Sequence, residues 1–454
     1  MNVVILGAAR QGLALARFLA RQGARVTLSD QRSAAQLEQA VQSLEGLPVQ
    51  WALGGHPLEL LDGADLLCLS GGIPLGLPIV VEAQRRGLPL SNDSQIFMEA
   101  VPCRVIAITG SAGKTTTTAL VGRMAAAAAS FPHRAWVGGN IGLPLIDHLD
   151  EISSDDLVVL ELSSFQLEQM TISPQVAAIL NISPNHLDRH GTMEAYTAAK
   201  ARILAFQGAQ DTAVLGREDP GAWNLAPQVK GRLVSFSAAR PPAGESGAFL
   251  EEGVFCFQDG EQVIPQASSS LVTLRGRHNL LNALAACAVA ASAGFAVQAV
   301  QKGFEGFSGV PHRLELVRNL HGVCWYNDSI ATAPERTIAA IHSFEEPLVL
   351  LLGGRDKKLP WEDLAALIHQ RVDHVVVFGE ANPIILQALG SQQSGRRPFT
   401  LAHCQTLQEA VLAAAGVAQP GSVVLLSPGG TSFDEFTDFE ERGERFRLWV
   451  NQLS

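Results

Sequence analysis

The sequence predicts an α/β protein of three domains: an N-terminal Rossmann-like domain, a central domain with a parallel sheet of the P-loop type, and a C-terminal Rossmann-like domain. Apolar runs that end in glycine or polar residues recur along the chain and alternate with helical stretches, which is typical of parallel sheets covered by helices. The 454 residues, 47% hydrophobic and 17% charged, are sufficient for several cores. We place the domains at residues 1–100, 101–308 and 309–454.

The first domain has the elements of a small doubly wound sheet. The run VVILG predicts a buried strand, residues 13–22 carry apolar side chains at helical spacing, and ARVTLSD predicts a second strand that ends on Asp30. The turn Gly7-x-Ala9-x-x-Gly12 is a weak dinucleotide fingerprint, because alanine replaces its middle glycine, and it leaves a dehydrogenase as one alternative. The strand signal recurs at residues 64–69 and 88–90.

The central region begins at Arg104, where VIAITG predicts a buried strand that leads through GSAGKTTTT into an apolar helix. Strand-like runs follow at residues 157–162 and 176–181, each ending in polar residues where a parallel sheet presents its carboxyl ends. Between residues 208 and 274 short alternating strands predominate, and we assign this stretch no chemistry. Helical periodicity returns at residues 278–291.

The last third of the chain repeats the α/β pattern after a break at GFSGVPHR. The runs PLVLLLGG, HVVVFGE and SVVLLSPGG predict three more buried strands, and helical stretches separate them. We therefore place the start of the third domain near Gly309.

Composition excludes several classes of protein. The formal net charge of −11 argues against a nucleic-acid partner held by phosphate neutralisation. The six cysteines show neither a CxxC pair nor zinc spacing, so we expect free thiols. No apolar run approaches the roughly 18 residues that span a bilayer, and the N-terminus lacks the pattern of a signal peptide. We therefore expect a cytoplasmic protein without a membrane span.

The segment from Gly110 to Thr115 is the strongest functional signal, because it follows a predicted strand and precedes a predicted helix. Backbone N–H groups and the helix N-terminus can converge there on phosphate oxygens, Lys114 adds a positive charge, and Thr115 offers a hydroxyl to Mg²⁺. The loop is shorter than a Walker segment, since Ser111 and Ala112 alone separate its glycines. The pattern predicts nucleotide binding, with an ordinary glycine turn as the alternative.

Three further residues are candidates for a metal and carboxylate site. Glu161 closes the strand LVVLELSS at the carboxyl edge of the sheet, where the phosphate loop is also expected. His186, in NISPNHLDRHG, offers an imidazole after another predicted strand. Lys200 lies on a helical stretch among alanines, and composition alone indicates a solvated lysine. Taken singly, each also fits a purely structural or surface position.

In their order along the chain, these motifs resemble the Mur ligase family of peptidoglycan synthesis. The motifs are ITGSAGKTTTT, GGNIGLP, ELSSFQLE, HLDRH, AKARI, GRHNLLNALAA, HRLE, NDSIAT, LLGGRDK and LSPGGTSFDEFTDFEERG. The last two are similar to the amino-acid-binding domain of the members that add D-glutamate. The resemblance implies an ATP-dependent ligase that joins D-glutamate to UDP-N-acetylmuramoyl-L-alanine through an acyl phosphate. It also implies that Lys200 is N-carbamylated.

The resemblance implies a role for each matching residue. The catalytic positions are Lys114, Glu161, His186 and Lys200, with Thr115 and Glu161 on one Mg²⁺ and His186 and Lys200 on a second. The positions that contact ATP are Gly110, Ser111, Ala112, Gly113, Lys114, Thr115, Thr116, Asn279, Asn282, Arg313 and Asp328. The positions that contact the UDP-linked substrate are Asp30, Arg32, Ser70, Gly72, Ile73 and Asn140, and those around D-glutamate are Thr332, Lys357, Ser432 and Phe439.

Three positions depart from the family pattern. Ile330 stands where the NDSKAT form of the motif carries a lysine, so any role of that amine is lost. Ala112 replaces an asparagine common in the loop, and Asn185 replaces an aspartate before the histidine. These departures bear on details of phosphate and metal contact and leave the predicted fold unchanged.

The implied chemistry answers a leaving-group problem, because a carboxylate does not expel oxide at neutral pH. Phosphorylation by ATP provides a better leaving group, and Lys114, two Mg²⁺ ions and the loop amides suit that step. We expect a monomer whose three domains close over the reactants. The alternatives are a muropeptide ligase for another amino acid, a folate polyglutamate ligase, a non-catalytic nucleotide-binding regulator and a dehydrogenase.

Overall fold

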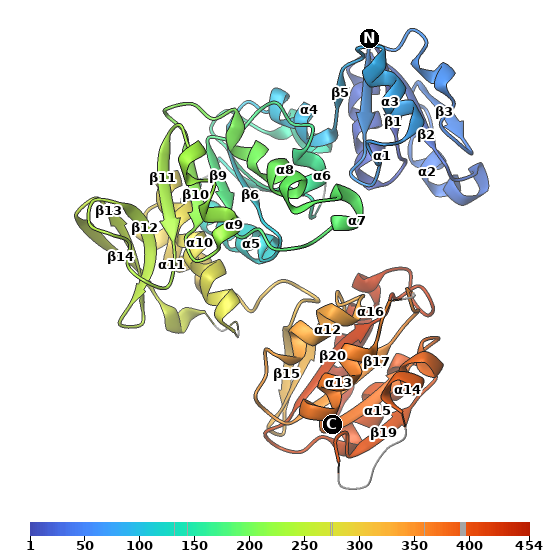
Figure 1. Ribbon diagram of the computed structural model, residues 1–454, viewed down its shortest axis with the longest axis vertical. Coiled ribbons are helices and arrows are strands. Elements are labelled where there is room, and N and C mark those ends of the chain that lie inside the picture. Colours follow the sequence, from blue (N-terminus) through green and yellow to red (C-terminus); the bar gives the residue numbers. More distant parts are fainter. Residues whose placement is uncertain (131, 143, 273, 275, 358, 391–395) are drawn as a thin grey trace. The chain divides into compact units, whose positions relative to one another are not determined.

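The computed structural model of the protein describes residues 1–454 except 131, 143, 273, 275, 358 and 391–395. The backbone packs into two compact units, of which the first holds most of the chain up to Phe307 and the second holds Ser308–Ser454. Parallel strand pairs predominate in the sheets of both units, so the predicted α/β class is confirmed (Figure 1). The domain boundaries proposed from the sequence stay predictions.

The first sheet is parallel throughout its described strands and has the order β3-β2-β1-β4-β5. Its strands are β1 (Asn2–Leu6), β2 (Arg25–Asp30), β3 (Val49–Leu53), β4 (Leu66–Leu69) and β5 (Leu90–Ser91). The order reverses between β1 and β4, and a ligand crevice in such a sheet lies at the carboxyl ends of the strands around that point. Gly7, Asp30 and Ser70 stand at those ends.

Helices cover both faces of the first sheet. The core on one face contains Ala14 and Leu15 of α1, and the core on the other contains Ile79 and Val80 of α3. The helical segments of this region are α1 (Arg10–Arg21), η1 (Ala34–Leu37), α2 (Glu38–Ser43), η2 (Leu58–Leu61), α3 (Pro78–Arg85) and α4 (Asp93–Ala100).

The second sheet has the order β14-β13-β12-β11-β10-β9-β6-β8-β7. The strands β12, β13 and β14 pair antiparallel, and the other pairs are parallel. The strands are β6 (Arg104–Thr109), β7 (Ala135–Gly139), β8 (Leu157–Glu161), β9 (Val176–Ile179), β10 (Thr212–Gly216), β11 (Arg232–Phe236), β12 (Ser246–Glu251), β13 (Val254–Asp259) and β14 (Gln262–Ser268). The adjacent strands β8, β6 and β9 bring Glu161, the phosphate loop and residue 181 to one edge.

Two groups of helices flank the second sheet. The helices α10 (Arg277–Ala293) and α11 (Val297–Phe304) pack against α5 (Lys114–Ala128), and α8 (Met193–Ala205) joins the core that contains Ala107 and Ala177. The shorter helical segments are η3 (Leu145–Glu151), α6 (Ser164–Leu167), α7 (Leu187–His190), α9 (Pro220–Trp223), η4 (Ala226–Gln228) and η5 (Ser269–Leu271). Because α5 begins where β6 ends, its N-terminus lies at the carboxyl edge of the sheet (Figure 1).

The second unit contains a sheet of order β15-β16-β20-β17-β18-β19, parallel except for the pair β15 and β16. Its strands are β15 (Glu315–Leu320), β16 (Val323–Asn327), β17 (Leu348–Gly353), β18 (His374–Phe378), β19 (Thr400–His403) and β20 (Val423–Gly429). The core on one face includes residues of α12 (Pro334–Ile341), α13 (Glu362–Arg371) and α14 (Asn382–Leu389), and the core on the other includes residues of α15 (Leu407–Val417) and α16 (Phe439–Gln452).

Two exclusions made from the sequence can be compared with the structure. The six cysteines are free thiols, as expected, and four of them are buried. In the part of the chain that the structure describes, the helices are too short or too polar to cross a bilayer.

Candidate functional site

The phosphate loop joins β6 to α5, and the segment after β9 holds it in place. Ser111 N–H donates to the Asn181 carbonyl at 2.9 Å, and Ala112 N–H donates to Asn181 Oδ1 at 2.8 Å. In return, Asn181 Nδ2 donates to the Ala112 carbonyl at 3.1 Å. Two of the loop's N–H groups therefore fix its conformation, and the first turn of α5 is left to offer backbone donors to an anion.

Gly113 brings α5 and α10 into close approach. Its φ of +81° lies in the left-handed region, and a Cβ built on it would stand 2.1 Å from Asn282 Oδ1. Asn282 in turn donates from Nδ2 to Asn279 Oδ1 at 3.1 Å, and both asparagines are buried. The structure thus brings together the loop and two of the positions predicted from the distant GRHNLLNALAA motif.

Two lysine amines meet at one loop carbonyl. Lys114 Nζ and Lys200 Nζ each donate to the Gly110 carbonyl at 2.9 Å. Lys200 is only 1% exposed, and this burial, together with the charge of Lys114, lowers the pKa of Lys200 to about 6, although Glu161 acts in the opposite direction. At neutral pH the Lys200 amine is therefore largely uncharged, which composition did not indicate.

Glu161 is the last residue of β8 and lies at the same edge. Asn140 Nδ2 donates to Glu161 Oε1 at 2.9 Å, and Asn140 N–H donates to the Glu161 carbonyl at 2.8 Å. The second carboxylate oxygen, Oε2, is buried and has no hydrogen-bond partner among the residues that the structure describes. A buried carboxylate oxygen left in this way fits a cation or a donor that the protein itself does not supply.

His186 is exposed and has a φ of +53°, and a series of ring contacts connects it to Lys200. Its ring lies 5.0 Å from Phe165, which stacks on His190 at 5.4 Å, and His190 lies 5.2 Å from Tyr196. Lys200 Nζ lies 4.8 Å from the centre of the Tyr196 ring. Within the described ranges, no three His, Cys, Asp or Glu side chains are grouped as metal ligands. The second metal pair therefore stays a prediction.

The nucleotide-type turn of the first sheet is tightly packed. A Cβ on Gly12 would stand 1.9 Å from the Gly7 carbonyl, so only glycine fits where α1 approaches the turn. Asp30 Oδ2 accepts from the Ala8 N–H at 2.7 Å, and the Asp30 carboxylate accepts from Arg32 Nε at 3.0 Å and Nη2 at 2.9 Å. This Arg32 contact holds the pKa of Asp30 well below its usual range.

The loop that contains Ser70, Gly72 and Ile73 contacts both the turn and α7. Ser70 Oγ donates to the Gly7 carbonyl at 2.9 Å. Arg189 donates from Nη1 to the Gly72 carbonyl at 3.3 Å and from Nη2 to the Ile73 carbonyl at 2.5 Å. Since Arg189 follows His186 by less than one helical turn, the predicted UDP loop is tied to the segment that carries a predicted metal ligand.

In the second unit, Asp328 is buried, and its carboxylate contacts the backbone of Leu314, the residue after Arg313. Its carboxylate accepts from Ser427 Oγ at 2.9 Å and from the Leu314 N–H at 3.2 Å. Burial raises the pKa of Asp328 to about 7, even though these donors act in the opposite direction. Positions 313 and 328, predicted to contact ATP, therefore lie on neighbouring segments.

Thr332 and Lys357, two of the positions predicted to surround the amino acid, are in contact. Lys357 Nζ donates to Thr332 Oγ1 at 3.3 Å, and burial and then the charge of Arg336 lower the pKa of Lys357. Ser432 is buried after β20, and its carbonyl accepts from the Phe436 N–H at 2.8 Å.

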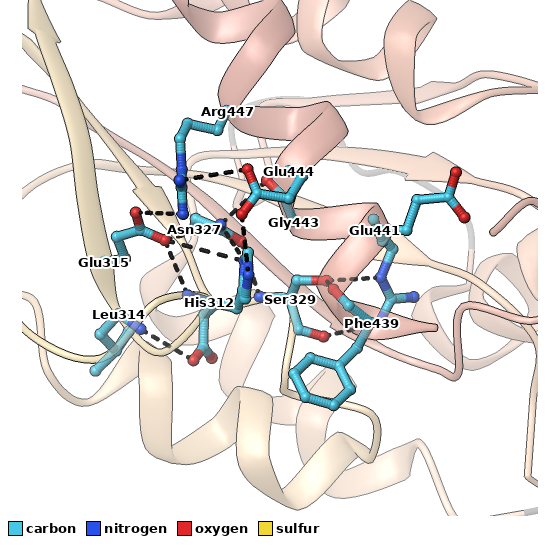
Figure 2. Close-up of polar contacts among 12 residues, drawn as sticks. His312, Leu314, Glu315, Asn327, Ser329, Phe439, Glu441, Gly443, Glu444 and Arg447 are labelled. Atoms are coloured by element: carbon cyan, nitrogen blue, oxygen red, sulfur yellow. Dashed lines mark hydrogen bonds and ion pairs between the residues drawn. The ribbon is translucent and has the colours of Figure 1, made fainter. Parts of the chain in front are cut away.

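Phe439, the last of the four amino-acid positions, begins α16. Its carbonyl accepts from Ser329 Oγ at 2.8 Å (Figure 2).

Comparison with known proteins covers the whole chain. The UDP-N-acetylmuramoylalanine–D-glutamate ligase of Acetivibrio thermocellus is 39% identical, with 100% of this chain and 96% of that protein aligned. The enzyme of the same name from Symbiobacterium thermophilum is 40% identical, with 100% and 98% aligned. The chain belongs to the Mur ligase family. Three family models match it: a MurD-like N-terminal domain at residues 1–91, the Mur ligase middle domain at 108–290 and the Mur ligase glutamate ligase domain at 312–430.

Solved structures share the Mur ligase fold. The UDP-N-acetylmuramate-alanine ligase of Thermotoga maritima aligns with a TM-score of 0.58 at 20% identity over 100% of this chain and 99% of that chain. A pseudomurein peptide ligase type C from Methanothermus fervidus aligns with a TM-score of 0.56 at 17% identity over 100% of both chains. At these identities the likeness concerns the fold alone, and it agrees with the three predicted α/β domains.

Sequence reasoning about this Mur ligase missed three residues that organise the sites. Asn181 follows β9 and holds the phosphate loop, and its place at the polar end of the predicted strand 176–181 is the signal that could have found it. Tyr196 precedes Lys200 by one helical turn, a spacing that places both on one face. Arg442 lies in the quoted FEERG motif and is fully buried, which charge alone would not predict.

Proposed function

We propose that this Mur ligase joins D-glutamate to UDP-N-acetylmuramoyl-L-alanine and converts ATP to ADP and phosphate. The observation that carries the proposal is the identity of 39% and 40%, over essentially the whole length, to two ligases named for that reaction. As a member of the family it is an ATP-dependent, amide-forming enzyme of peptidoglycan precursor synthesis. A dehydrogenase or a folate ligase has no comparable support.

The phosphate loop supports the first chemical step. Lys114 Nζ and the N–H groups at the start of α5 hold the phosphates of ATP, because they place positive charge and donors at one preformed turn. Transfer of the γ-phosphoryl group to the substrate carboxylate needs charge neutralisation and in-line positioning rather than a protein nucleophile. The carboxylate oxygen forms the new P–O bond, and ADP leaves with the electrons of the broken one.

Glu161 and Thr115 fit a Mg²⁺ ion that accompanies ATP. Mg²⁺ neutralises the phosphate charge when it is bound. Glu161 Oε2 is buried and open to a new ligand, while Asn140 orients the other carboxylate oxygen. The Thr115 hydroxyl lies in the first turn of α5 and adds a hard oxygen ligand.

Lys200 is suited to carbamylation because its amine is buried and largely neutral. The Nζ lone pair attacks CO₂, an N–C bond forms, and a proton leaves to give a carbamate. This change converts a donor into a carboxylate-like acceptor, which is the ligand type that a second Mg²⁺ prefers. We assign His186 to the same ion on the strength of the family motif.

The amine of D-glutamate then attacks the acyl phosphate and expels phosphate, losing its proton. Lys357, Thr332 and Ser432 supply a cation and hydroxyls for the two carboxylates of the amino acid, and Phe439 flanks them.

We place the UDP moiety at the turn around Asp30. The predicted substrate positions all come from one chain, so we propose a monomer that acts in the cytoplasm, where ATP is available.

The reaction can be tested with the purified protein, Mg²⁺, ATP and both substrates. We expect one ADP and one phosphate for each product molecule, and a product heavier than UDP-N-acetylmuramoyl-L-alanine by one glutamyl residue. Lys114→Ala should abolish turnover while the circular dichroism spectrum is kept, and the exposed Lys302→Ala is the matched control. Full activity of Lys114→Ala would contradict the assigned phosphate site.

A further inference from the structure

Arg442 is a fully buried guanidinium on α16 whose hydrogen bonds go to neutral acceptors. Its relative exposure is 0%. Nε donates to Ser329 Oγ at 3.0 Å and Nη2 donates to the Ser329 carbonyl at 2.8 Å. Nη1 and Nη2 each donate to the Gly430 carbonyl at 3.1 Å. A buried charge is costly, so the presence of this guanidinium needs an explanation beyond packing.

The guanidinium of Arg442 lies where three loops meet. Besides Ser329 and Gly430, it adjoins Gly354, because a Cβ built on that glycine would stand 2.8 Å from Arg442 Nη1. Each loop leads within three residues to a position proposed to contact the amino acid: Ser329 to Thr332, Gly430 to Ser432 and Gly354 to Lys357. The fourth such position, Phe439, lies one turn before Arg442, and its carbonyl is bonded to the same Ser329 hydroxyl (Figure 2).

Two carboxylates favour the charge of Arg442, but among the described residues its guanidinium donates its hydrogen bonds to neutral oxygens. Burial lowers the pKa of Arg442 to about 10, so the group stays charged at neutral pH, and Asp434 and Glu435 favour that charge. Both carboxylates have donors elsewhere: Asp434 Oδ2 accepts from the Glu380 N–H at 3.2 Å, and Glu435 Oε2 accepts from the Leu407 N–H at 3.1 Å. Arg442 also repels the Lys357 ammonium. An anionic ligand beside Lys357 would relieve that repulsion.

We infer that Arg442 is a positioning residue for the incoming amino acid, because its hydrogen bonds join two of these loops, it adjoins the third, and its positive charge favours an anion among them. Its guanidinium fork fixes Ser329 and Gly430 relative to each other, and the loops place Thr332, Ser432 and Lys357 around the two carboxylates. The inference rests on the proposed function, since it takes those residues as the amino-acid site.

The test measures steady-state constants of four variants for D-glutamate, ATP and the UDP-linked substrate. Arg442→Met removes the charge and the fork, Arg442→Lys keeps only the charge, and Ser329→Ala removes one acceptor of the fork without altering the arginine. Arg445→Met is the control, because Arg445 lies on the same helix, is half-exposed and forms an ion pair with Glu441 at 3.8 Å.

We expect Arg442→Met to raise the KM for D-glutamate at least about tenfold, with the KM values for ATP and the UDP-linked substrate changed less than about twofold. Arg442→Lys should recover part of this loss, and Ser329→Ala should raise the same KM by a smaller factor. If Arg442→Met does not fold, the KM of Ser329→Ala for D-glutamate decides whether the inference holds. An unchanged KM for D-glutamate in Ser329→Ala, or an equal rise in Arg445→Met, would overturn the inference. Failure of the wild-type protein to use D-glutamate would instead refute the proposed function.

Discussion

At the scale of single residues, the Lys200 amine has the most unusual environment in the proposed active site. It is buried beside Lys114, and the pKa falls from 10.5 to about 6. Between these two pH values the unfolded chain holds a proton that the folded chain lacks. The free energy of unfolding therefore rises with pH over this range because of this group.

A comparison of wild type with Lys200→Met tests this shift. In carbonate-free buffer, the free energy of unfolding of wild type relative to the variant should rise by about 1 kcal/mol per pH unit between pH 6.5 and 9.5. Urea titrations at four pH values measure it. A difference independent of pH would mean that the amine titrates outside this range, and it would remove the support for carbamylation.

Glu161 has a buried carboxylate oxygen that fits a metal ion as its ligand. Glu161→Gln keeps an oxygen for Asn140 but loses the negative charge, so we expect kcat to fall at least about 100-fold and half-saturation to need more Mg²⁺. ADP release measured against Mg²⁺ concentration checks this. The exposed Glu151→Gln serves as control, and a Mg²⁺ dependence equal to that of wild type would argue against Glu161 as a metal ligand.

The sequence predicted some of these residues better than others. Lys114, Thr115 and Glu161 could be predicted because each either ends a buried strand or directly follows the turn after one, and strand ends meet at one edge of a parallel sheet. The burial of Lys200 and Arg442 could not be predicted from the sequence. It depends on which segments pack over a side chain, and a charged residue on a helix is ordinarily solvated.

At the scale of elements, the start of α5 depends on Gly113. Gly113→Ala places a side chain at a φ of +81° and against Asn282, whereas Gly244→Ala faces the same backbone cost, with a φ of +83°, but has no atom within 4 Å of the new Cβ. Each substitution should cost about 1 kcal/mol of backbone strain. Gly113→Ala alone should also weaken ATP binding, by at least about tenfold, since the loop must shift.

Calorimetric titration with ATP and thermal unfolding of the two glycine variants measure both effects. Equal ATP affinities in Gly113→Ala and Gly244→Ala would show that the contact of the loop with α10 does not matter for the nucleotide.

Helices were predicted correctly where the helical spacing of apolar residues extends over several turns. The helix predicted at residues 13–22 is α1 at Arg10–Arg21, and the helix predicted at 278–291 is α10 at Arg277–Ala293. The four-residue helices α6 and α7 could not be predicted, because one turn is too short to show a helical period. Yet α7 follows His186 and carries Arg189, so part of the candidate site lay in the least predictable kind of element.

At the scale of the whole molecule, three sheets each present a loop-lined edge, and the positions proposed for each substrate lie mainly at a different edge. Asp30 and Ser70 lie at the edge of the first sheet, the phosphate loop at the edge of the second, and Lys357 and Ser432 in loops at the edge of the third. An amide ligase with three substrates requires such a division, because the acyl phosphate must meet the amine before water does.

The most direct test of the account is ADP release by the wild-type enzyme with UDP-N-acetylmuramoyl-L-alanine and a panel of amino acids: D-glutamate, L-glutamate, L-lysine and meso-diaminopimelate. We predict release with D-glutamate and at least about 100-fold lower kcat/KM with the other three, since a site with paired carboxylate contacts rejects ligands that leave its polar groups unmatched. Release that depends on another amino acid, with none on D-glutamate, would contradict the account.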